Sequence, residues 1–204
     1  YVLRSIPSGI FQGGKVNIIG NGVVLAPDLF MEEAKSLEAS GHDLKSRLHI
    51  SKKAHLIMPT HRVLDAAYEA AKGKSKVGTT GKGIGPTYTD KTARRGLRIG
   101  DIAADDFKAR YERLKNIHLA QIKNLDFDMN ELLLDKMPFD QYEEEWFKAI
   151  EFLKQFQFIE SEYFINKSLD EGKRVLAEGA QGTLLDVDFG SYPFVTSSST
   201  VAAG

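Results

Sequence analysis

A glycine-rich segment with threonine and lysine side chains is the part of the chain best suited to holding an anion. Residues 78–86 read GTTGKGIGP, and the four glycines let the backbone approach a ligand closely. Thr79, Thr80 and Lys82 add donors that suit a phosphate. A glycine follows the lysine where a Walker A loop needs Ser or Thr, and Pro86 stands where a dinucleotide fingerprint needs a third glycine. The segment predicts a phosphate site of another kind, the alternative being a solvated flexible loop.

Four basic residues follow directly and could hold the same anion. They are Lys91, Arg94, Arg95 and Arg98. Arginine guanidinium groups grip phosphates and carboxylates through two parallel hydrogen bonds. If this stretch is helical, Lys91, Arg94 and Arg98 share one face. A charged surface helix is the alternative, and the neighbouring glycine-rich segment favours the ligand.

Two later segments also carry polar groups at turns. Residues 178–186, EGAQGTLLD, form a strand-to-helix turn in which the amide of Gln181 can read a base edge with one donor and one acceptor. The alternative is a tight turn in which Gln181 caps a backbone group. Residues 196–200, TSSST, place hydroxyls at an expected helix N-terminus, which suits a phosphate as well as an ordinary N-cap.

The remaining titratable residues do not predict a metal site. The five histidines show no metal-ligand spacing, so we expect structural or surface roles for His42, His49, His55, His61 and His118. Asp186 and Asp188 are expected to cap backbone groups or to pair with arginines.

The elements that must position these groups alternate between strand and helix. Residues 15–20, 22–25 and 55–58 have the β-branched or apolar runs of strands, and helical periodicity follows Pro27 and Pro59. This alternation predicts an α/β fold with a mainly parallel central sheet and flanking helices.

The pattern divides the chain into three parts. We predict an α/β core portion at residues 1–103, a helical insertion at 104–172 that is broken at Pro138, and a return to the α/β core at 173–204. Within the first part, residues 78–98 are predicted to be a long loop or a set of turns. Within the last, residues 174–178 and 192–196 are predicted to be strands.

Composition excludes several classes of protein. The chain has 204 residues, 42% hydrophobic and 27% charged, as in a globular protein with a real core. The net charge of −1 gives no general attraction for nucleic acid or an anionic membrane, and no apolar run is long enough to span a bilayer. The absence of cysteine excludes disulfides and fits a reducing cytoplasm. Because it opens on Tyr1 and stops within small residues, we expect the chain to be part of a longer protein.

The combination of motifs resembles one enzyme family. Residues 83–94, GIGPTYTDKTAR, match every fixed position of the adenylosuccinate synthetase signature G-I-G-P-x-Y-x-x-K-x-x-R. Further stretches that resemble the family occur in the same order: IPSGI at 6–10, IGNGVV at 19–24, RRGLR at 94–98, EGAQGTLLD at 178–186 and YPFVTSS at 192–198. The resemblance covers nearly the whole chain apart from the helical insertion.

The resemblance implies a P-loop-type ligase fold and a GTP-dependent C–N ligation in a homodimer. GTP would phosphorylate the 6-oxygen of IMP, and the amine of L-aspartate would displace that phosphate, giving adenylosuccinate, GDP and phosphate. A phosphate leaves more easily than a purine carbonyl oxygen, so activation precedes amination. Magnesium would act at the GTP phosphates.

Site residues follow from the same resemblance. The implied IMP contacts are Thr80 and Thr196 at the phosphate, Gln181 at the base and Leu185 beside the nucleotide. Arg94 resembles the arginine that reaches across the dimer interface to the partner's IMP. Lys91 matches the signature lysine, treated as an active-site residue, for which we expect a charge or interface role.

Several parts of the family pattern do not occur in this sequence. They are the Gly-Asp-Glu-Gly-Lys-Gly phosphate loop with its catalytic aspartate, the Asn-Ala-Gly-His-Thr segment with its catalytic histidine, and the aspartate-binding and guanine-recognition segments. We therefore expect much of the IMP pocket here, magnesium ligands elsewhere, and no activity from these residues alone. Arg4 and Ser199 replace the family's usual His and Asn, so no role is carried over to them. The alternative is a noncatalytic IMP-binding or dimerisation module.

Overall fold

Parallel strands form the centre of the molecule. The computed structural model describes residues 2–73, 78 and 80–201, so Thr79 lies outside the described residues. The strands are β1 (Asn17–Ile19), β2 (Val24–Leu25), β3 (Leu48–Ser51), β4 (His55–Leu56) and β5 (Gln157–Ile159). They make a three-stranded sheet in the order β1-β3-β5 and a two-stranded sheet of β2 and β4, all parallel. The predicted α/β class is confirmed.

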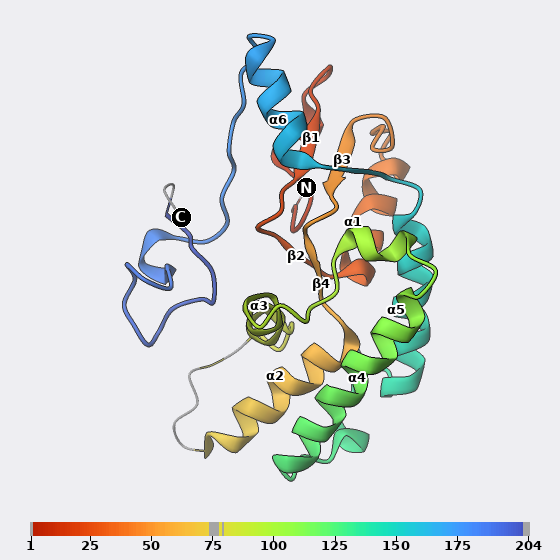
Figure 1. The fold of residues 1–204 in the computed structure, drawn as a ribbon, viewed down its shortest axis with the longest axis vertical. Helices are drawn as coiled ribbons and strands as arrows, with labels where there is room; N and C mark the ends of the chain where they lie inside the picture. Colours follow the sequence, from red (N-terminus) through yellow and green to blue (C-terminus); the bar gives the residue numbers. More distant parts are fainter. Residues whose placement is uncertain (1, 74–77, 79, 202–204) are drawn as a thin grey trace.

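Most helices lie beside or below the strands, and α6 lies above them, at the top of the view (Figure 1). They are α1 (Pro27–Ala39), α2 (Pro59–Ala71), α3 (Ile84–Thr92), α4 (Phe107–Asn124), α5 (Phe139–Leu153) and α6 (Ser161–Asp170). Prolines begin α1 and α2, as the sequence predicts, because a first-turn position needs no N–H donor. The apolar face of α1 is buried through Phe30, Ala34 and Leu37.

The largest apolar core lies between the strands and helices α1, α4 and α5. Leu48, Ile50 and Trp146 are fully buried in it. Burial of side chains of this size contributes roughly 1.5–3 kcal/mol each. The Trp146 indole donates to the Ile57 carbonyl oxygen at 2.8 Å, which ties α5 to the segment after β4. The core and this hydrogen bond therefore hold α5 against the segment that leads into α2.

Two segments in the middle of the chain differ from the pattern predicted for them. Residues 104–172, predicted to be helical, also contain β5, which pairs with β3 through His49 and Gln157. Its three residues are too few to show a period, so only the sheet partner reveals the strand. Residues 78–98, predicted to be loop or turns, contain the nine-residue helix α3. Its one glycine and three threonines are weak helix formers, and packing on α2 overrides that preference.

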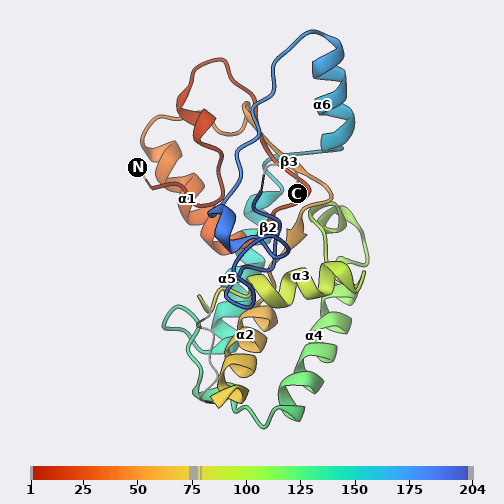
Figure 2. The ribbon, with the colours of Figure 1, turned by 90° about the vertical axis from the view of Figure 1, so that its left-hand side faces the viewer.

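The two predicted strands near the C-terminus are not strands. Residues 174–178 are extended but unpaired, and Leu176 is 91% exposed. Residues 192–196 form turns. An isolated run of apolar residues becomes a strand only beside a neighbour, and no described strand lies next to either segment. Figures 1 and 2 show residues 173–201 instead as a separate lobe beside α3. Among the described residues, no helix combines the length and apolarity needed to cross a membrane.

Candidate functional site

The glycine-rich segment ends in a sharp turn that begins α3. Gly83 has a φ of 77°, in the left-handed region that favours glycine. A Cβ at Gly83 would lie 3.0 Å from the backbone nitrogen of Arg62, so the turn sits directly on α2. The Thr87 hydroxyl lies 2.7 Å from the Gly83 carbonyl oxygen. Thr80, just before this turn, is exposed to solvent.

A buried polar network holds α3 from below. Asp90 Oδ2 lies 3.1 Å from His61 Nε2 and 2.8 Å from His118 Nε2. Arg95 Nε donates to the other carboxylate oxygen of Asp90 at 2.7 Å. Burial alone would raise the pKa of Asp90, but the hydrogen bonds from both imidazoles and from Arg95 hold it below its usual range.

The same three residues have the composition of a small metal site, but their hydrogen bonds argue against one. His61, Asp90 and His118 place ligand atoms within 4.8 Å of one another. However, the backbone N–H of Met58 donates to His61 Nδ1 at 2.9 Å, so the proton of the neutral ring sits on Nε2. That nitrogen faces Asp90 as a donor and has no lone pair for a metal. The network is therefore structural.

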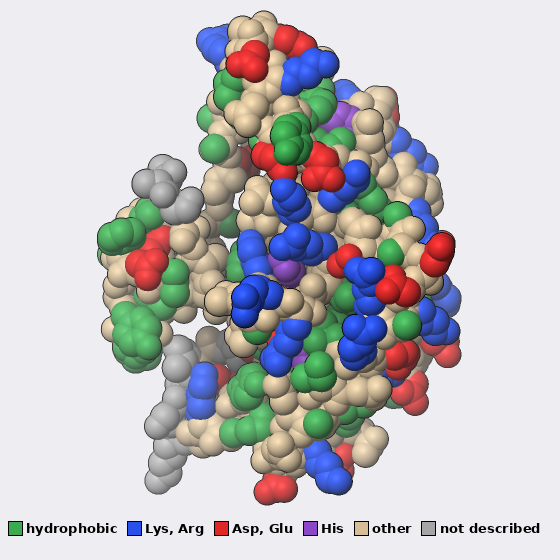
Figure 3. Space-filling model, in the orientation of Figure 1, with side chains coloured by type: hydrophobic (Ala, Val, Ile, Leu, Met, Phe, Trp, Pro, Cys, Tyr) green, Lys and Arg blue, Asp and Glu red, His purple; other side chains and the backbone are tan. Residues whose placement is uncertain are grey.

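Two residues of α3 connect it to the turn between β1 and β2. Tyr88 donates its hydroxyl proton to the Gly22 carbonyl oxygen at 2.8 Å, and Lys91 Nζ donates to the Asn21 carbonyl oxygen at 3.3 Å. Burial, and after it the charge of Arg98, lowers the pKa of Lys91. Figure 3 shows Lys and Arg side chains gathered over the middle of this face.

The basic residues predicted to share a helical face are separated by the end of α3. The helix stops at Thr92, and Arg94 has a left-handed φ of 61°. Arg95 turns back to Asp90, whereas the Arg94 side chain is exposed and has no hydrogen-bond partner among the described residues. The guanidinium of Arg94 is thus available to a group outside this chain.

The lobe at residues 173–201 is organised around one carboxylate. Asp186 is fully buried and accepts four backbone N–H groups, those of Asp188, Phe189, Thr200 and Val201. These bonds, led by those of Phe189 and Val201, lower the pKa of Asp186 to about 2. The predicted backbone-capping role of Asp186 thus fits the geometry.

Three of the predicted site residues are neighbours within this lobe. Thr196 N–H donates to the Leu185 carbonyl oxygen at 2.8 Å, and the Thr200 hydroxyl donates to Gly182 at 2.9 Å. Gln181 lies on the same turn with a left-handed φ of 69° and is exposed. Gln181, Leu185 and Thr196 therefore belong to one surface.

The lobe meets α3 at the glycine-rich turn. A Cβ at Gly85 would lie 3.4 Å from Ser197 Oγ. The Tyr88 hydroxyl forms a hydrogen bond with the Ser198 side chain. The structure thereby brings the 178–201 region to the helix that begins at the glycine-rich segment. Thr80 itself has no hydrogen bond to the lobe within the described part of the chain.

The N-terminal segment is joined to the same lobe. The backbone N–H and the hydroxyl of Ser8 both donate to Glu178 Oε2 at 2.9 Å. At the other end of this segment, Glu33 accepts the N–H groups of Arg4 at 2.7 Å and Ser5 at 2.9 Å. Glu178 thus joins the N-terminal segment to the lobe, although the two are far apart in the sequence.

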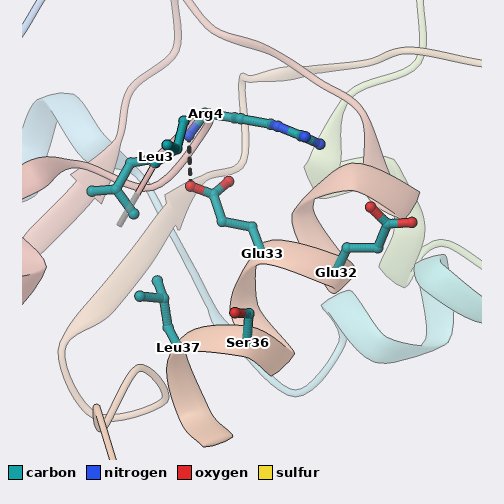
Figure 4. Close-up of a pocket in the computed structure, with 7 residues that line it drawn as sticks. Leu3, Arg4, Glu32, Glu33, Ser36 and Leu37 are labelled. Atoms are coloured by element: carbon teal, nitrogen blue, oxygen red, sulfur yellow. Dashed lines mark hydrogen bonds between the residues drawn. The ribbon is translucent and has the colours of Figure 1, made fainter. Parts of the chain in front are cut away.

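A separate cavity of about 340 Å³ lies beside that N-terminal segment (Figure 4). Its lining residues are Val2, Leu3, Arg4, Glu32, Glu33, Ser36 and Leu37. Figure 4 shows the Glu33 carboxylate turned toward the backbone of Arg4, whose guanidinium extends away from it. None of the six predicted site residues lines this cavity, so it is distinct from the candidate site.

Sequence reasoning missed the charged residues that support the site. Arg62, Asp65 and Glu69 of α2 contact the glycine-rich segment, and Asp135 contacts Arg62. Arg62, Asp65 and Glu69 are spaced i, i+3, i+7 on α2, so a shared polar face could have been predicted from the sequence. Asp135 carried no local signal, because its role depends on a distant helix.

Comparisons with known proteins point to one family. The family model described as adenylosuccinate synthetase matches residues 1–204. The adenylosuccinate synthetase of Bacteroides fragilis is 66% identical over 100% of this chain and 46% of its own length, and that of Porphyromonas gingivalis is 60% identical with the same coverage. The chain therefore spans about half the length of the curated relatives it matches. The solved structure of fully ligated adenylosuccinate synthetase from Plasmodium falciparum superposes with a TM-score of 0.83 at 32% identity, covering 100% of this chain and 45% of that one.

Proposed function

The chain belongs to the adenylosuccinate synthetase family, and we propose that a protein carrying it together with the rest of the family's sequence joins L-aspartate to IMP. The reaction consumes GTP and gives adenylosuccinate, GDP and phosphate. In this proposal the enzyme is a cytoplasmic homodimer, and the present residues supply much of its IMP pocket.

One observation carries the proposal. The lobe with Gln181, Leu185 and Thr196 packs against α3 at Gly85 and Tyr88, next to the glycine-rich segment that bears Thr80. Hydroxyls, an amide and an apolar side chain on adjoining segments are the groups that a nucleoside monophosphate needs. A phosphate and a base can then be held at opposite ends of one surface.

Each predicted residue has a distinct task in this proposal. Thr80 and Thr196 donate hydroxyl hydrogen bonds to the IMP phosphate, Gln181 reads the hypoxanthine edge and Leu185 packs beside the nucleoside. These contacts orient the 6-oxygen for phosphoryl transfer, and correct orientation is a large part of catalysis in such reactions.

Two basic residues act at the edge of the pocket. Arg94, exposed at the end of α3, extends to the IMP bound by the partner subunit. Lys91 holds the Asn21 carbonyl and presents a positive charge at the interface. Its hydrogen bond to the Asn21 carbonyl oxygen supports a charge or interface role.

GTP and magnesium bind through the rest of the protein in this proposal. Magnesium prefers carboxylate and phosphate oxygens, and it neutralises the charge of the GTP phosphates. The buried carboxylates at the site are already engaged. Asp186 accepts four backbone N–H groups, Asp90 faces Arg95 and two imidazoles, and Asp65 accepts the Gly83 N–H. The donor set of the described site therefore does not fit the metal.

Product formation tests the proposal. The complete protein is supplied with IMP, GTP, aspartate and magnesium, and each is omitted in turn while adenylosuccinate is measured. Product that requires all three substrates supports the ligase. IMP binding by a folded, complete protein that forms no product would instead favour the noncatalytic binding module.

A further inference from the structure

The glycine-rich segment is hydrogen-bonded along one face of α2. Asp65 Oδ2 accepts the Gly83 N–H at 2.9 Å, and Glu69 Oε1 accepts the Gly78 N–H at 2.8 Å. Gly81 lies between these two glycines in the sequence, and Arg62 Nε donates to its carbonyl oxygen at 3.3 Å. Residues at i, i+3 and i+7 lie on the same side of a helix, so α2 presents one charged ridge to the segment.

Arg62 is itself held firmly. Its guanidinium donates to both carboxylate oxygens of Asp135, at 2.5 and 3.1 Å. It also stacks on the ring of Tyr142, 4.9 Å from the centroid, and the Tyr142 hydroxyl donates to Asp28 at 2.6 Å. The bidentate pair and the stacking fix the plane of the guanidinium.

The contacts from this ridge order the glycine-rich segment before a ligand binds, which reduces the entropic cost of binding. Fixing the backbone of each residue costs about 1–2 kcal/mol of conformational entropy, and glycine loses more than other residues. A segment ordered in advance binds a ligand without meeting that cost during binding. The anchors at Gly78, Gly81 and Gly83 enclose Thr80, which remains exposed to meet the ligand.

We propose that Arg62, Asp65 and Glu69 are positioning residues that set the conformation of the glycine-rich segment at Gly78, Gly81 and Gly83 for a phosphate bound near Thr80. Asp135, from the connection between α4 and α5, is the counter-ion that holds Arg62 in place. The inference rests on the proposed function, in which that phosphate belongs to IMP. None of the four residues touches the ligand.

Variants of Asp65 in the complete protein test the ridge. Asp65→Val removes the acceptor at nearly constant volume, and Asp65→Asn keeps a carbonyl oxygen that can still accept the Gly83 N–H. Loss of one such bond is expected to raise the KM for IMP about tenfold in the Val variant. The Asn variant is expected to stay close to wild type. The KM values for GTP and aspartate should not change, and Tyr68→Phe, at an exposed position of the same helix, is the matched control.

A second variant covers the case in which Asp65→Val fails to fold. Asp135 is 39% exposed, so Asp135→Asn should fold while loosening the guanidinium of Arg62. It is expected to raise the KM for IMP several-fold with kcat retained, because it weakens the bidentate ion pair without creating a cavity.

The outcomes separate the two proposals. If the wild-type protein does not bind IMP, or if Thr80→Val leaves IMP affinity unchanged, the proposed phosphate contact is wrong. If Thr80→Val weakens IMP binding but folded Asp65→Val and Asp135→Asn both keep the wild-type KM for IMP, the ridge has no positioning role.

Discussion

His61 and Asp90 meet beneath α3, where the imidazole Nε2 lies 3.1 Å from the carboxylate Oδ2. The ring is fully buried, and its other nitrogen accepts the Met58 N–H. Protonating that nitrogen would break the Met58 bond. Burial lowers the pKa of His61 to about 4, and the hydrogen bond to Asp90 only partly opposes this effect.

This histidine predicts acid sensitivity of the fold. Because the folded pKa of about 4 lies below the ordinary value near 6.5, the unfolded chain binds more protons between these values. Stability should therefore fall as pH drops from 6.5 toward 4, by on the order of 2 kcal/mol between pH 7 and pH 5 for His61. Buried His55, whose pKa is also lowered to about 4, acts in the same direction.

Urea unfolding of the complete protein at the two pH values measures the effect. His61→Gln cannot titrate, so the pH dependence should be smaller in that variant. Equal stability of the wild-type protein at pH 7 and pH 5 would contradict the buried neutral imidazole.

Gly83→Ala is predicted to destabilise the turn that begins α3. The left-handed φ and the 3.0 Å approach of a Cβ to Arg62 together should lower the free energy of unfolding by about 1–3 kcal/mol. Gly13→Ala is the control, since a Cβ there meets nothing within 4 Å and φ is not positive. Similar melting temperatures for the two variants would show that the turn tolerates a side chain.

Asp186→Ala is predicted to loosen the lobe that carries Gln181 and Thr196. Four backbone N–H groups would lose their acceptor, so limited proteolysis should cleave within residues 182–201 faster than in wild type. IMP affinity should fall in parallel. Asp188→Ala removes a neighbouring exposed carboxylate as a control, and equal cleavage of both variants would refute the organising role of Asp186.

Arg94→Leu is predicted to act on the partner's site. Alone, it should raise the KM for IMP, as should Gln181→Ala in its own pocket. Mixed dimers of the two variants contain one intact site, so random mixing should restore roughly a quarter of wild-type activity at low IMP. No recovery in dimers shown to exchange subunits would mean that Arg94 serves its own chain.

The core elements were predictable from sequence because local signals agree with packing there. Pro27 and Pro59 mark the helix starts, and the run before Pro59 forms the buried strand β4. In contrast, β5 depends on its pairing with β3, and α3 depends on α2 and on the buried Asp90. Residues 174–178 have the composition of a strand but no neighbour to pair with. Elements that depend on such distant partners are difficult to predict from sequence.

The candidate site shows the same division. The six predicted residues were recognised through the family motifs, whereas the ridge of Arg62, Asp65 and Glu69 was not, because charged residues on a helix usually face solvent. Only the position of the glycine-rich segment shows that this face is covered. The support of a site is thus less visible in sequence than the groups that touch the ligand.

The central claim, that Thr80 and Thr196 hold the phosphate of IMP, is tested most directly by calorimetric titration of IMP into the complete protein. Thr80→Val and Thr196→Val should each weaken IMP binding about tenfold or more, as expected for a lost hydrogen bond to a charged group. Inosine, which lacks the phosphate, should bind wild type and variants with the same affinity, and GTP affinity should be unaffected. If both variants bind IMP as tightly as wild type, the pocket described here is not the IMP site.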